Sequence, residues 1–454
     1  MHTPDAAIEA MAQTIARWVT DRLRNGPGPL RPPPPAADFA SLVGSTVTED
    51  GIGADEAFRV FTDVLAPACL ATDHPRFLSF IPGAPTAAAS LFEAVLGVSA
   101  IFGGSWIEGS GAVHAENETL RWLADLTGFP DSAGGVFVSG GSAGNLSALV
   151  VARTRWRARQ PSGRGYRPVL ICSEEAHASV HKAAEILDVD VHALPAGAEG
   201  RLDRAVLRSF AETIDETTRA ATFAVVATAG LPNTGTVDDL AAAADLAVAC
   251  DAWFHVDGAY GAAAMLSPRT RSLFLGIERA DSVIVDPHKW LFAPYDVCAL
   301  IYRDPELARH VHTQHAEYLD PILLDDSGVN PSDLAYHLTR RARGLPLWFS
   351  LATHGTAAYR QTIERTLDLT ARAADMIRDS GHLEVVVEPQ LSVVLFRRRG
   401  WSSVDYYTWS DEALRGGTAF LLPSEWRGET VFRCCFVNPR TTEDDLNVVF
   451  ESMA

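Results

Sequence analysis

The stretch SVIVDPHKW (residues 282–290) places a single lysine, Lys289, directly behind an apolar run with the composition of a buried strand. A buried ammonium is unstable unless it is paired with an acid or neutralised. We therefore expect Lys289 to have a chemical role at the end of this strand, with partners supplied by neighbouring segments.

Similar apolar runs alternate with Ala- and Leu-rich helical segments between about residue 88 and residue 300. Their continuous hydrophobicity is typical of strands that are buried on both faces, as in a mainly parallel sheet covered by helices. The pattern thus predicts an α/β fold, in which ligands bind at the carboxyl ends of the strands. The predicted strands are GGVFVSG (134–140), PVLICS (168–173), TFAVVATAG (222–230), WFHVDG (253–258), SVIVDP (282–287) and VCALIYR (297–303).

The two ends of the chain have a different organisation. An amphipathic helical pattern near the N-terminus is followed by PGPLRPPPP (27–35), which is too rich in proline for helix or central strand. We expect residues 1–85 to form an arm that packs on another subunit, and residues 86–345 to form the large domain. A long helical segment, strand-like runs at 383–388, 392–398 and 431–438, and a terminal helix from Thr442 predict a small α+β domain over 346–454.

Composition excludes several classes of partner. The formal net charge of −19 disfavours nucleic acid and anionic membrane, and no apolar stretch is long enough to span a bilayer. The six cysteines form no CxxC pair, which favours reduced thiols in a cytoplasmic protein over disulfides or a metal site.

Polar residues follow three of the predicted strands. Ser139-Gly140-Gly141-Ser142 joins a strand to a helix, where backbone N–H groups could bind phosphate, although Ser142 could equally be an ordinary helix cap. His177 follows the next strand and is either a cap or a ligand at the same rim. Asp257 is either a helix cap or the partner of a buried cation, and the small Ala259 beside it leaves room for a flat group.

These features are mutually consistent with pyridoxal 5′-phosphate (PLP). A lysine in a dry pocket is expected to have a lowered pKa and to form a Schiff base with an aldehyde. An aspartate opposite it suits a pyridinium nitrogen, a glycine-rich turn suits the phosphate, and a histidine can stack on the ring. The sequence therefore predicts a PLP site with Lys289 as the lysine that holds the cofactor.

The order of the motifs resembles the group II PLP-dependent decarboxylases, the aromatic-L-amino-acid decarboxylase family of fold-type I (aspartate aminotransferase-like) enzymes. The resemblance implies a large domain with a mainly parallel seven-stranded sheet and decarboxylation of an L-amino acid, aromatic in type, to the amine and carbon dioxide. It also implies a homodimer with active sites at the interface. The matching segments extend from HPRFLSF (74–80) through SGGSAGN (139–145), SEEAHASV (173–180), HVDGAYG (255–261), PHKW (287–290) and RRARGLPLW (340–348) to FVNPRTTEDDL (436–446).

Carried over by position, the resemblance implies a role for each candidate residue. Lys289 holds the cofactor, Asp257 pairs with its ring nitrogen, and His177 stacks on the ring and orients the substrate carboxylate. The remaining cofactor contacts implied are Gly141, Ser142 and His288 near the phosphate and Ala259 near the ring. Tyr318, in an EYL context, corresponds to the loop tyrosine that protonates the reacting carbon, and the alternative is a tyrosine in an ordinary surface loop.

Substrate and reaction are less fixed by the sequence. Phe77, Phe80 and Trp106 lie in segments that line the substrate pocket of relatives, but could also be core residues. Glycines at 83, 103 and 104 are expected to enlarge that pocket. Leu231-Pro232 replaces the family's threonines near the histidine, and Asp286 stands where some relatives have asparagine. Another PLP reaction at Cα, by an aldehyde synthase, lyase or aminotransferase, therefore stays open.

Overall fold

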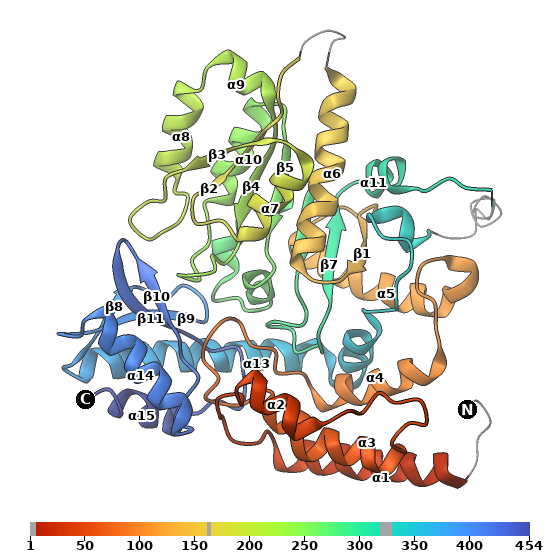
Figure 1. The fold of residues 1–454 in the computed structure, drawn as a ribbon. Helices are drawn as coiled ribbons and strands as arrows, with labels where there is room; N and C mark the ends of the chain where they lie inside the picture. The colour runs from red at the N-terminus through yellow and green to blue at the C-terminus, as the bar shows by residue number, and fades with distance from the viewer. Residues whose placement is uncertain (1–5, 161–164, 318–328) are drawn as a thin grey trace.

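A seven-stranded sheet forms the centre of the computed structural model, which describes residues 6–160, 165–317 and 329–454 (Figure 1). The strand order is β1-β7-β6-β5-β4-β2-β3, and only β7 runs antiparallel to its neighbours. The predicted mainly parallel sheet is therefore confirmed. The strands are β1 Gly134–Val138, β2 Val169–Ser173, β3 Asp190–Leu194, β4 Thr222–Thr228, β5 Trp253–Asp257, β6 Ser282–Val285 and β7 Cys298–Tyr302.

All six predicted strands are present, and β3 is the one that sequence reasoning missed. Its sequence, DVHAL, has an exposed first residue and only one buried residue, because β3 is an edge strand paired with β2 alone. An edge strand of this kind lacks the continuous apolar signal of the strands between two neighbours.

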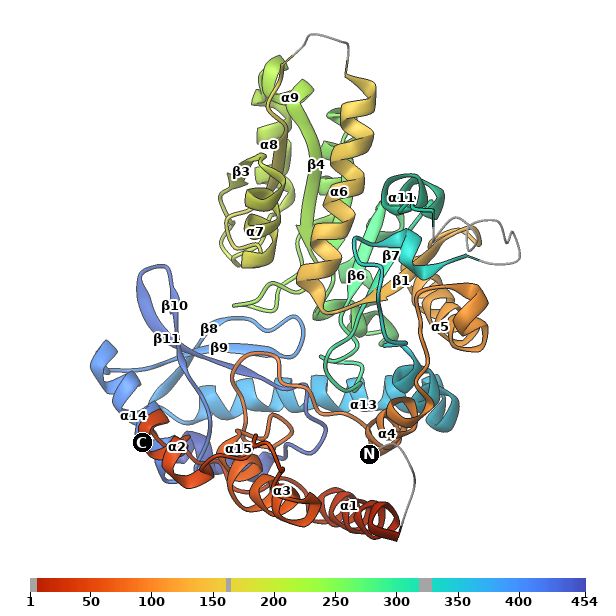
Figure 2. The same cartoon turned by 45° about the vertical axis from the view of Figure 1, so that its right-hand side comes forward.

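Helices cover both faces of this sheet (Figure 2). On one face α6, α7 and α11 pack in a hydrophobic cluster with β1, β2 and β7, and on the other α5, α8 and α10 share a second cluster with the sheet. The helices of this region are α5 Trp106–Thr127, α6 Gly141–Arg159, α7 Ala178–Leu187, α8 Arg204–Thr213, α9 Glu216–Ala221, α10 Leu240–Ala249 and α11 Pro305–His312, with short turns η3 Gly261–Leu266, η4 Arg271–Phe274, η5 Ile277–Arg279 and η6 Pro331–Leu334.

The C-terminal part is a four-stranded antiparallel sheet in the order β10-β11-β9-β8, beside the long helix α13 (Figure 1). The predicted small α+β unit is thus confirmed, with β10 as an additional short strand. Its elements are α13 Leu345–Asp379, β8 Leu383–Val387, β9 Val393–Arg398, α14 Ser403–Arg415, β10 Pro423–Trp426, β11 Glu429–Cys435 and α15 Glu443–Glu451. The terminal helix predicted from Thr442 is α15, which begins at Glu443 with Thr442 as its N-cap.

The N-terminal segment lies along the outside of the molecule (Figures 1 and 2). It contains α1 Ala6–Asn25, α2 Ala36–Val43, α3 Ala54–Val60, the turns η1 Phe61–Leu65 and η2 Ala66–Ala68, and α4 Ala87–Ser99. Helix α1 has no buried residue, whereas Leu30 of the extended linker is only 1% exposed and packs on Phe77 and Phe420. The linker therefore fastens the arm to the small domain. Among the described residues no helix is long and apolar enough to cross a membrane.

Candidate active site

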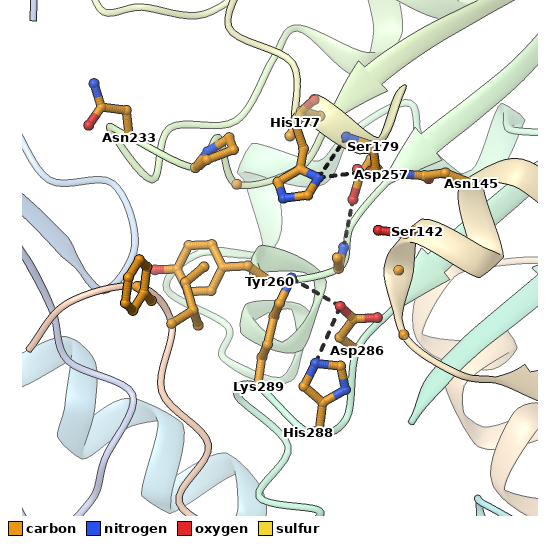
Figure 3. Close-up of a pocket in the computed structure, with 18 of the residues that line it drawn as sticks. Ser142, Asn145, His177, Ser179, Asn233, Asp257, Tyr260, Asp286, His288 and Lys289 are labelled. Carbon is orange, nitrogen blue, oxygen red and sulfur yellow. Dashed lines mark hydrogen bonds and ion pairs between the residues drawn. The ribbon is translucent and has the colours of Figure 1, made fainter. Parts of the chain in front are cut away.

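A cavity of about 660 Å³ opens at the carboxyl ends of β1, β2, β4, β5 and β6, where the large sheet meets the small one (Figure 3). Two ends can be distinguished by their lining. We define the cofactor end by Ser142, Asn145, His177, Asp257, Asp286 and Lys289, and the substrate end by Phe80, Ile81, Tyr295, Leu422, Ser424 and Arg433.

Lys289 is paired with Asp286, the residue of its motif that had no predicted role. The lysine Nζ lies 3.0 Å from Asp286 Oδ2, and the two side chains are 21% and 2% exposed. Burial alone would lower the pKa of Lys289, but the nearby carboxylates of Asp286 and Asp257 outweigh it and raise this pKa. The expected lowered pKa is therefore wrong for the cofactor-free chain, because sequence reasoning did not place Asp286 against the ammonium.

Asp257 ends β5 and is held by two N–H groups. Its Oδ1 accepts from the backbone N–H of Ala259 at 3.1 Å, and its Oδ2 accepts from Asn145 Nδ2 at 2.9 Å. With only 4% exposure, the carboxylate needs such donors to be stable in the interior. Its negative charge also contributes to the raised pKa of Lys289, so both predicted residues act within the same pocket.

His177 caps helix α7 and borders the same cavity. Its Nδ1 accepts the backbone N–H of Ser179 at 3.2 Å and lies 2.8 Å from the Ser179 hydroxyl. Asn145 donates to that hydroxyl at 2.9 Å, so it contacts both the Asp257 and the His177 sides of the pocket. Sequence reasoning missed Asn145, although an asparagine that follows a glycine-rich turn within an Ala- and Leu-rich helix was a usable signal.

The turn before α6 has the form of an anion site. Gly140 adopts φ +91°, a conformation that glycine tolerates, and the helix begins at Gly141 without any side-chain cap. The alternative that Ser142 caps the helix is therefore wrong, since Ser142 lies within its first turn. His288 borders this turn, with Nδ1 2.6 Å from the backbone oxygen of Val297, and burial lowers its pKa.

These residues fit PLP. The free N–H groups of the α6 N-terminus suit its phosphate, and a lysine and a buried aspartate that line the same pocket suit its aldehyde and ring nitrogen. Two buried oxygens that line the cavity, Asp286 Oδ1 and Thr228 Oγ1, have no hydrogen-bond partner among the described residues. Orphaned polar atoms of this kind are typical of a site built for a ligand.

The substrate end differs from the predicted one. Phe80 lines the cavity and is 62% exposed, whereas Phe77 is 5% exposed and packs on Phe420, and Trp106 does not line the cavity. The predicted enlargement by glycines is wrong. A Cβ on Gly83 would lie 2.9 Å from a backbone oxygen and 3.0 Å from the Tyr295 ring, and one on Gly104 would lie 2.5 Å from the Phe102 ring.

Arg433 of β11 was missed by sequence reasoning and is the only arginine among the described residues that line the cavity. It is 9% exposed, donates to the backbone oxygen of Phe80, and leaves its buried Nε without a partner in the described part of the chain. A basic residue inside the apolar strand VFRCC was the available signal. Leu231 is buried outside the cavity while Pro232 lines it, and Tyr318 lies outside the described residues.

Comparisons with known proteins agree with this geometry. The model of the family described as "Pyridoxal-dependent decarboxylase conserved domain" matches residues 45–399. The aromatic-L-amino-acid decarboxylase of Bacillus atrophaeus is 34% identical over 384 residues, covering 82% of this chain and 79% of the relative. The L-2,4-diaminobutyrate decarboxylase of Rhizobium meliloti (strain 1021) is 33% identical over 360 residues, covering 77% and 71%. The crystal structure of Oryza sativa TDC with PLP and tryptamine matches the fold with a TM-score of 0.91 at 23% identity, covering 100% of this chain and 98% of that one.

Proposed function

The chain belongs to the pyridoxal-dependent decarboxylases and is a PLP-dependent amino acid decarboxylase, and from that premise we propose that its substrate is an aromatic L-amino acid. The observation that carries this proposal is the lining of the substrate end. Phe80, Ile81, Tyr295 and Leu422 offer apolar or aromatic surface. Among the described lining residues the only carboxylates are Asp257 and Asp286, both at the cofactor end.

The relatives act on two classes of substrate, which this lining separates. L-2,4-Diaminobutyrate carries a second ammonium, and a buried cation requires an anionic partner. The substrate end instead contains Arg433, which would repel it. An aromatic side chain gains free energy from burial against apolar surface and needs no such partner.

Each candidate residue has a proposed role. When bound, PLP supplies an aldehyde that holds the amino group and a ring that accepts the electrons left when carbon dioxide departs. Lys289 binds the aldehyde, Asp257 pairs with the ring nitrogen, and His177 stacks on the ring. The phosphate is held by Gly141, Ser142 and His288, and Ala259 leaves space beside the ring.

Arg433 and His177 orient the substrate carboxylate in this proposal. Arg433 has an unpartnered Nε–H, and His177 presents a ring nitrogen to the cavity (Figure 3). Charge-assisted hydrogen bonds of this kind fix a carboxylate strongly. Holding it in one orientation selects which bond to Cα breaks, so these two residues favour loss of carbon dioxide over other reactions at Cα.

The substrate proposal is tested with purified protein loaded with PLP. Tryptophan, tyrosine, phenylalanine and L-2,4-diaminobutyrate are supplied separately, and carbon dioxide, amine, aldehyde and keto acid are each measured. We expect carbon dioxide and amine in equal amounts from an aromatic substrate. Faster turnover of L-2,4-diaminobutyrate would contradict the substrate class, and aldehyde or keto acid as main product would contradict the reaction.

Tyr318 is proposed as the acid that protonates Cα, on the resemblance of its EYL context alone. The variant Tyr318→Phe keeps the ring and removes the acidic proton. We expect it to lose most amine production, and in this family a phenylalanine at this position is associated with aldehyde formation. Undiminished amine production by this variant would remove Tyr318 from the mechanism.

We further propose a homodimer with active sites at the interface. Helix α4 exposes Leu91, Val95 and Val98, which are 48%, 47% and 86% exposed, and such an apolar face is typical of a subunit contact. Light scattering at micromolar concentration should give twice the mass of 48.9 kDa. A fully active monomer would contradict the proposal.

A cytoplasmic location is proposed on the state of the cysteines. All six are free thiols, and five of them are buried. Free buried thiols are usual in a reducing compartment. Cell fractionation with antibody detection tests this proposal, and recovery outside the cytoplasm would contradict it.

A further inference from the structure

A chain of buried hydrogen bonds runs beneath the cofactor end, from the middle of the sheet to the cavity. Trp253 Nε1 donates to Ser282 Oγ at 2.8 Å, and the same Oγ lies 2.8 Å from His255 Nδ1. His255 Nε2 lies 2.9 Å from Asn145 Oδ1. The four side chains are at most 1% exposed, so no bulk water can replace these partners.

The charge of Asp257 determines which group donates and which accepts in each of these hydrogen bonds. Asp257 accepts from Asn145, so the amide nitrogen of Asn145 faces Asp257 and the amide oxygen faces His255. The opposite amide orientation would place two acceptors 2.9 Å apart. His255 must therefore carry its proton on Nε2, while its Nδ1 accepts the hydroxyl proton of Ser282. Burial lowers the pKa of His255 to about 4, so the ring is neutral near pH 7.

A second branch of the chain reaches the other side of the cavity. The remaining N–H of Asn145 is donated to Ser179 Oγ, which leaves the Ser179 hydroxyl proton for His177 Nδ1. The backbone N–H of Ser179 also points at this nitrogen. Because Nδ1 accepts both, the proton of neutral His177 lies on Nε2, the nitrogen that faces the cavity in Figure 3.

We propose that Asn145 and His255 are positioning residues, which together keep Asp257 Oδ2 as an acceptor and fix the proton of His177 on Nε2. A single buried amide thereby prepares both the carboxylate that would pair with the ring nitrogen and the histidine that would stack on the ring. His255 acts only through Asn145, because its one N–H locks the amide orientation. This inference rests on the proposed roles of Asp257 and His177.

A cofactor-binding experiment tests the proposal with PLP itself as the probe. The variant His255→Phe keeps a ring and loses the N–H, whereas His255→Gln places an amide N–H near the position of Nε2. We expect His255→Phe to weaken the equilibrium binding of PLP by about tenfold or more. The variant loses the hydrogen bond to Asn145, the residue that donates to the Asp257 carboxylate. His255→Gln should recover most of that loss.

Two further variants separate positioning from folding. Ser282→Ala removes the hydroxyl that donates to His255 Nδ1 and accepts from Trp253 Nε1, and we expect a loss of PLP affinity of a few fold with the fold retained. His312→Gln is the matched control, because His312 is also buried, at 6% exposure, and hydrogen-bonds a backbone oxygen of α6 without reaching the site. It should bind PLP as the unaltered protein does. Unchanged affinity in both Ser282→Ala and a folded His255→Phe would overturn the proposal.

A direct measurement is available on the unaltered, cofactor-free protein. Nitrogen-15 NMR of labelled histidine, assigned with His255→Gln, should show a neutral His255 ring protonated on Nε2 at pH 7. A ring protonated on Nδ1 would overturn the proposal. The NMR result does not depend on which substrate is decarboxylated. A failure of the proposed function would therefore leave the NMR result unchanged, and the two failures can be told apart.

Discussion

The two ends of the cavity are built in different ways. At the cofactor end the side chains come from the ends of neighbouring strands and the starts of helices α6 and α7. Asn145, Asp257 and Asp286 are at most 4% exposed, and Asn145 hydrogen-bonds three buried side chains. At the substrate end the side chains come from the N-terminal segment, the 295 loop and the small sheet, and Phe80 and Tyr295 are 62% and 50% exposed. The residues proposed for the chemistry are thus supported by a buried hydrogen-bond network, and those proposed for substrate recognition lie on more exposed segments.

This difference predicts that substitutions at the cofactor end have larger effects. Removing one member of a buried charged set leaves the others unpaired, which typically costs about 3–5 kcal/mol. Removing one contact at the exposed end costs about 1 kcal/mol or less, because water replaces it. Four variants, ordered from the largest expected effect to the smallest, test this contrast.

Lys289→Ala should have the largest effect. It removes the amine that we propose captures the cofactor, and it removes the lysine that lies 3.0 Å from Asp286. We expect activity to fall by at least about a thousandfold, comparable to the loss of a covalent catalytic group. Borohydride treatment followed by peptide mass spectrometry should find no reduced PLP–lysine adduct. A trapped lysine adduct in this variant would reassign the cofactor lysine.

Asp286→Asn should change the pH dependence of cofactor capture. The lysine must lose its proton before it attacks the aldehyde, and Asp286 and Asp257 raise the pKa of Lys289 even though burial lowers it. The variant should lower this pKa, so capture at pH 7 becomes faster and its pH profile moves to lower pH. Each unit of change gives about tenfold more free amine. Stopped-flow absorbance with PLP measures the rate.

The control for this prediction is Asp296→Asn, which removes an aspartate of a nearby loop whose carboxylate is 48% exposed and pairs with Arg343. It should leave the pH profile of cofactor capture unchanged.

The raised pKa of Lys289 also predicts how stability depends on pH. Because the folded pKa of Lys289 lies above its ordinary value of 10.5, the stabilising Lys289–Asp286 pair is fully present below pH 10.5. It is lost as pH rises through the folded pKa. Slower capture in Asp286→Asn would refute this account.

The sequence predicted most of the residues at the cofactor end, because they lie at the ends of apolar strands. Lys289, Asp257, His177 and the turn at Gly141 follow apolar strands, so strand-end reasoning placed them at one rim correctly. Asp286 belongs to the same motif as Lys289, but its contact with Lys289 at 3.0 Å depends on how the chain turns after β6. A pattern of residue types contains no such information.

The substrate end was predicted less well because its parts are far apart in sequence. Phe80 and Arg433 meet across 353 positions, through a backbone contact that no local pattern encodes. Gly83 and Gly104 looked like added space, yet the structure fills that space with Tyr295 and Phe102. A glycine indicates a larger cavity only when the residues that surround it in the fold are known. The domain limits, the residue roles and Tyr318 stay predictions.

Arg433→Lys should have an intermediate effect, confined to substrate binding. The arginine contacts the Phe80 oxygen through one nitrogen of its planar guanidinium, and its Nε–H is free for a carboxylate. Lysine keeps the charge but loses this planar set of donors. We expect the KM for the amino acid to rise about tenfold while the affinity for PLP changes little. Steady-state kinetics and PLP titration measure the two quantities. Arg427→Lys, at the turn between β10 and β11 and outside the cavity lining, is the control. Equal losses in both quantities would place Arg433 at the cofactor end instead.

Tyr295→Phe should have the smallest effect, although it also alters a cavity residue. The Tyr295 hydroxyl accepts the backbone N–H of Gly83 at 2.8 Å and is on a side chain that is 50% exposed. Because water can replace this hydrogen bond, we expect the free energy of unfolding to fall by about 0.5–1 kcal/mol and KM to rise only a few fold. Tyr336→Phe is a matched control, since Tyr336 is also 50% exposed and lies outside the cavity lining. Denaturant unfolding and steady-state kinetics provide the comparison. If Tyr295→Phe instead reduced activity as strongly as Lys289→Ala, the substrate end would share in the chemistry, and the division between a buried chemical end and a tolerant recognition end would be wrong.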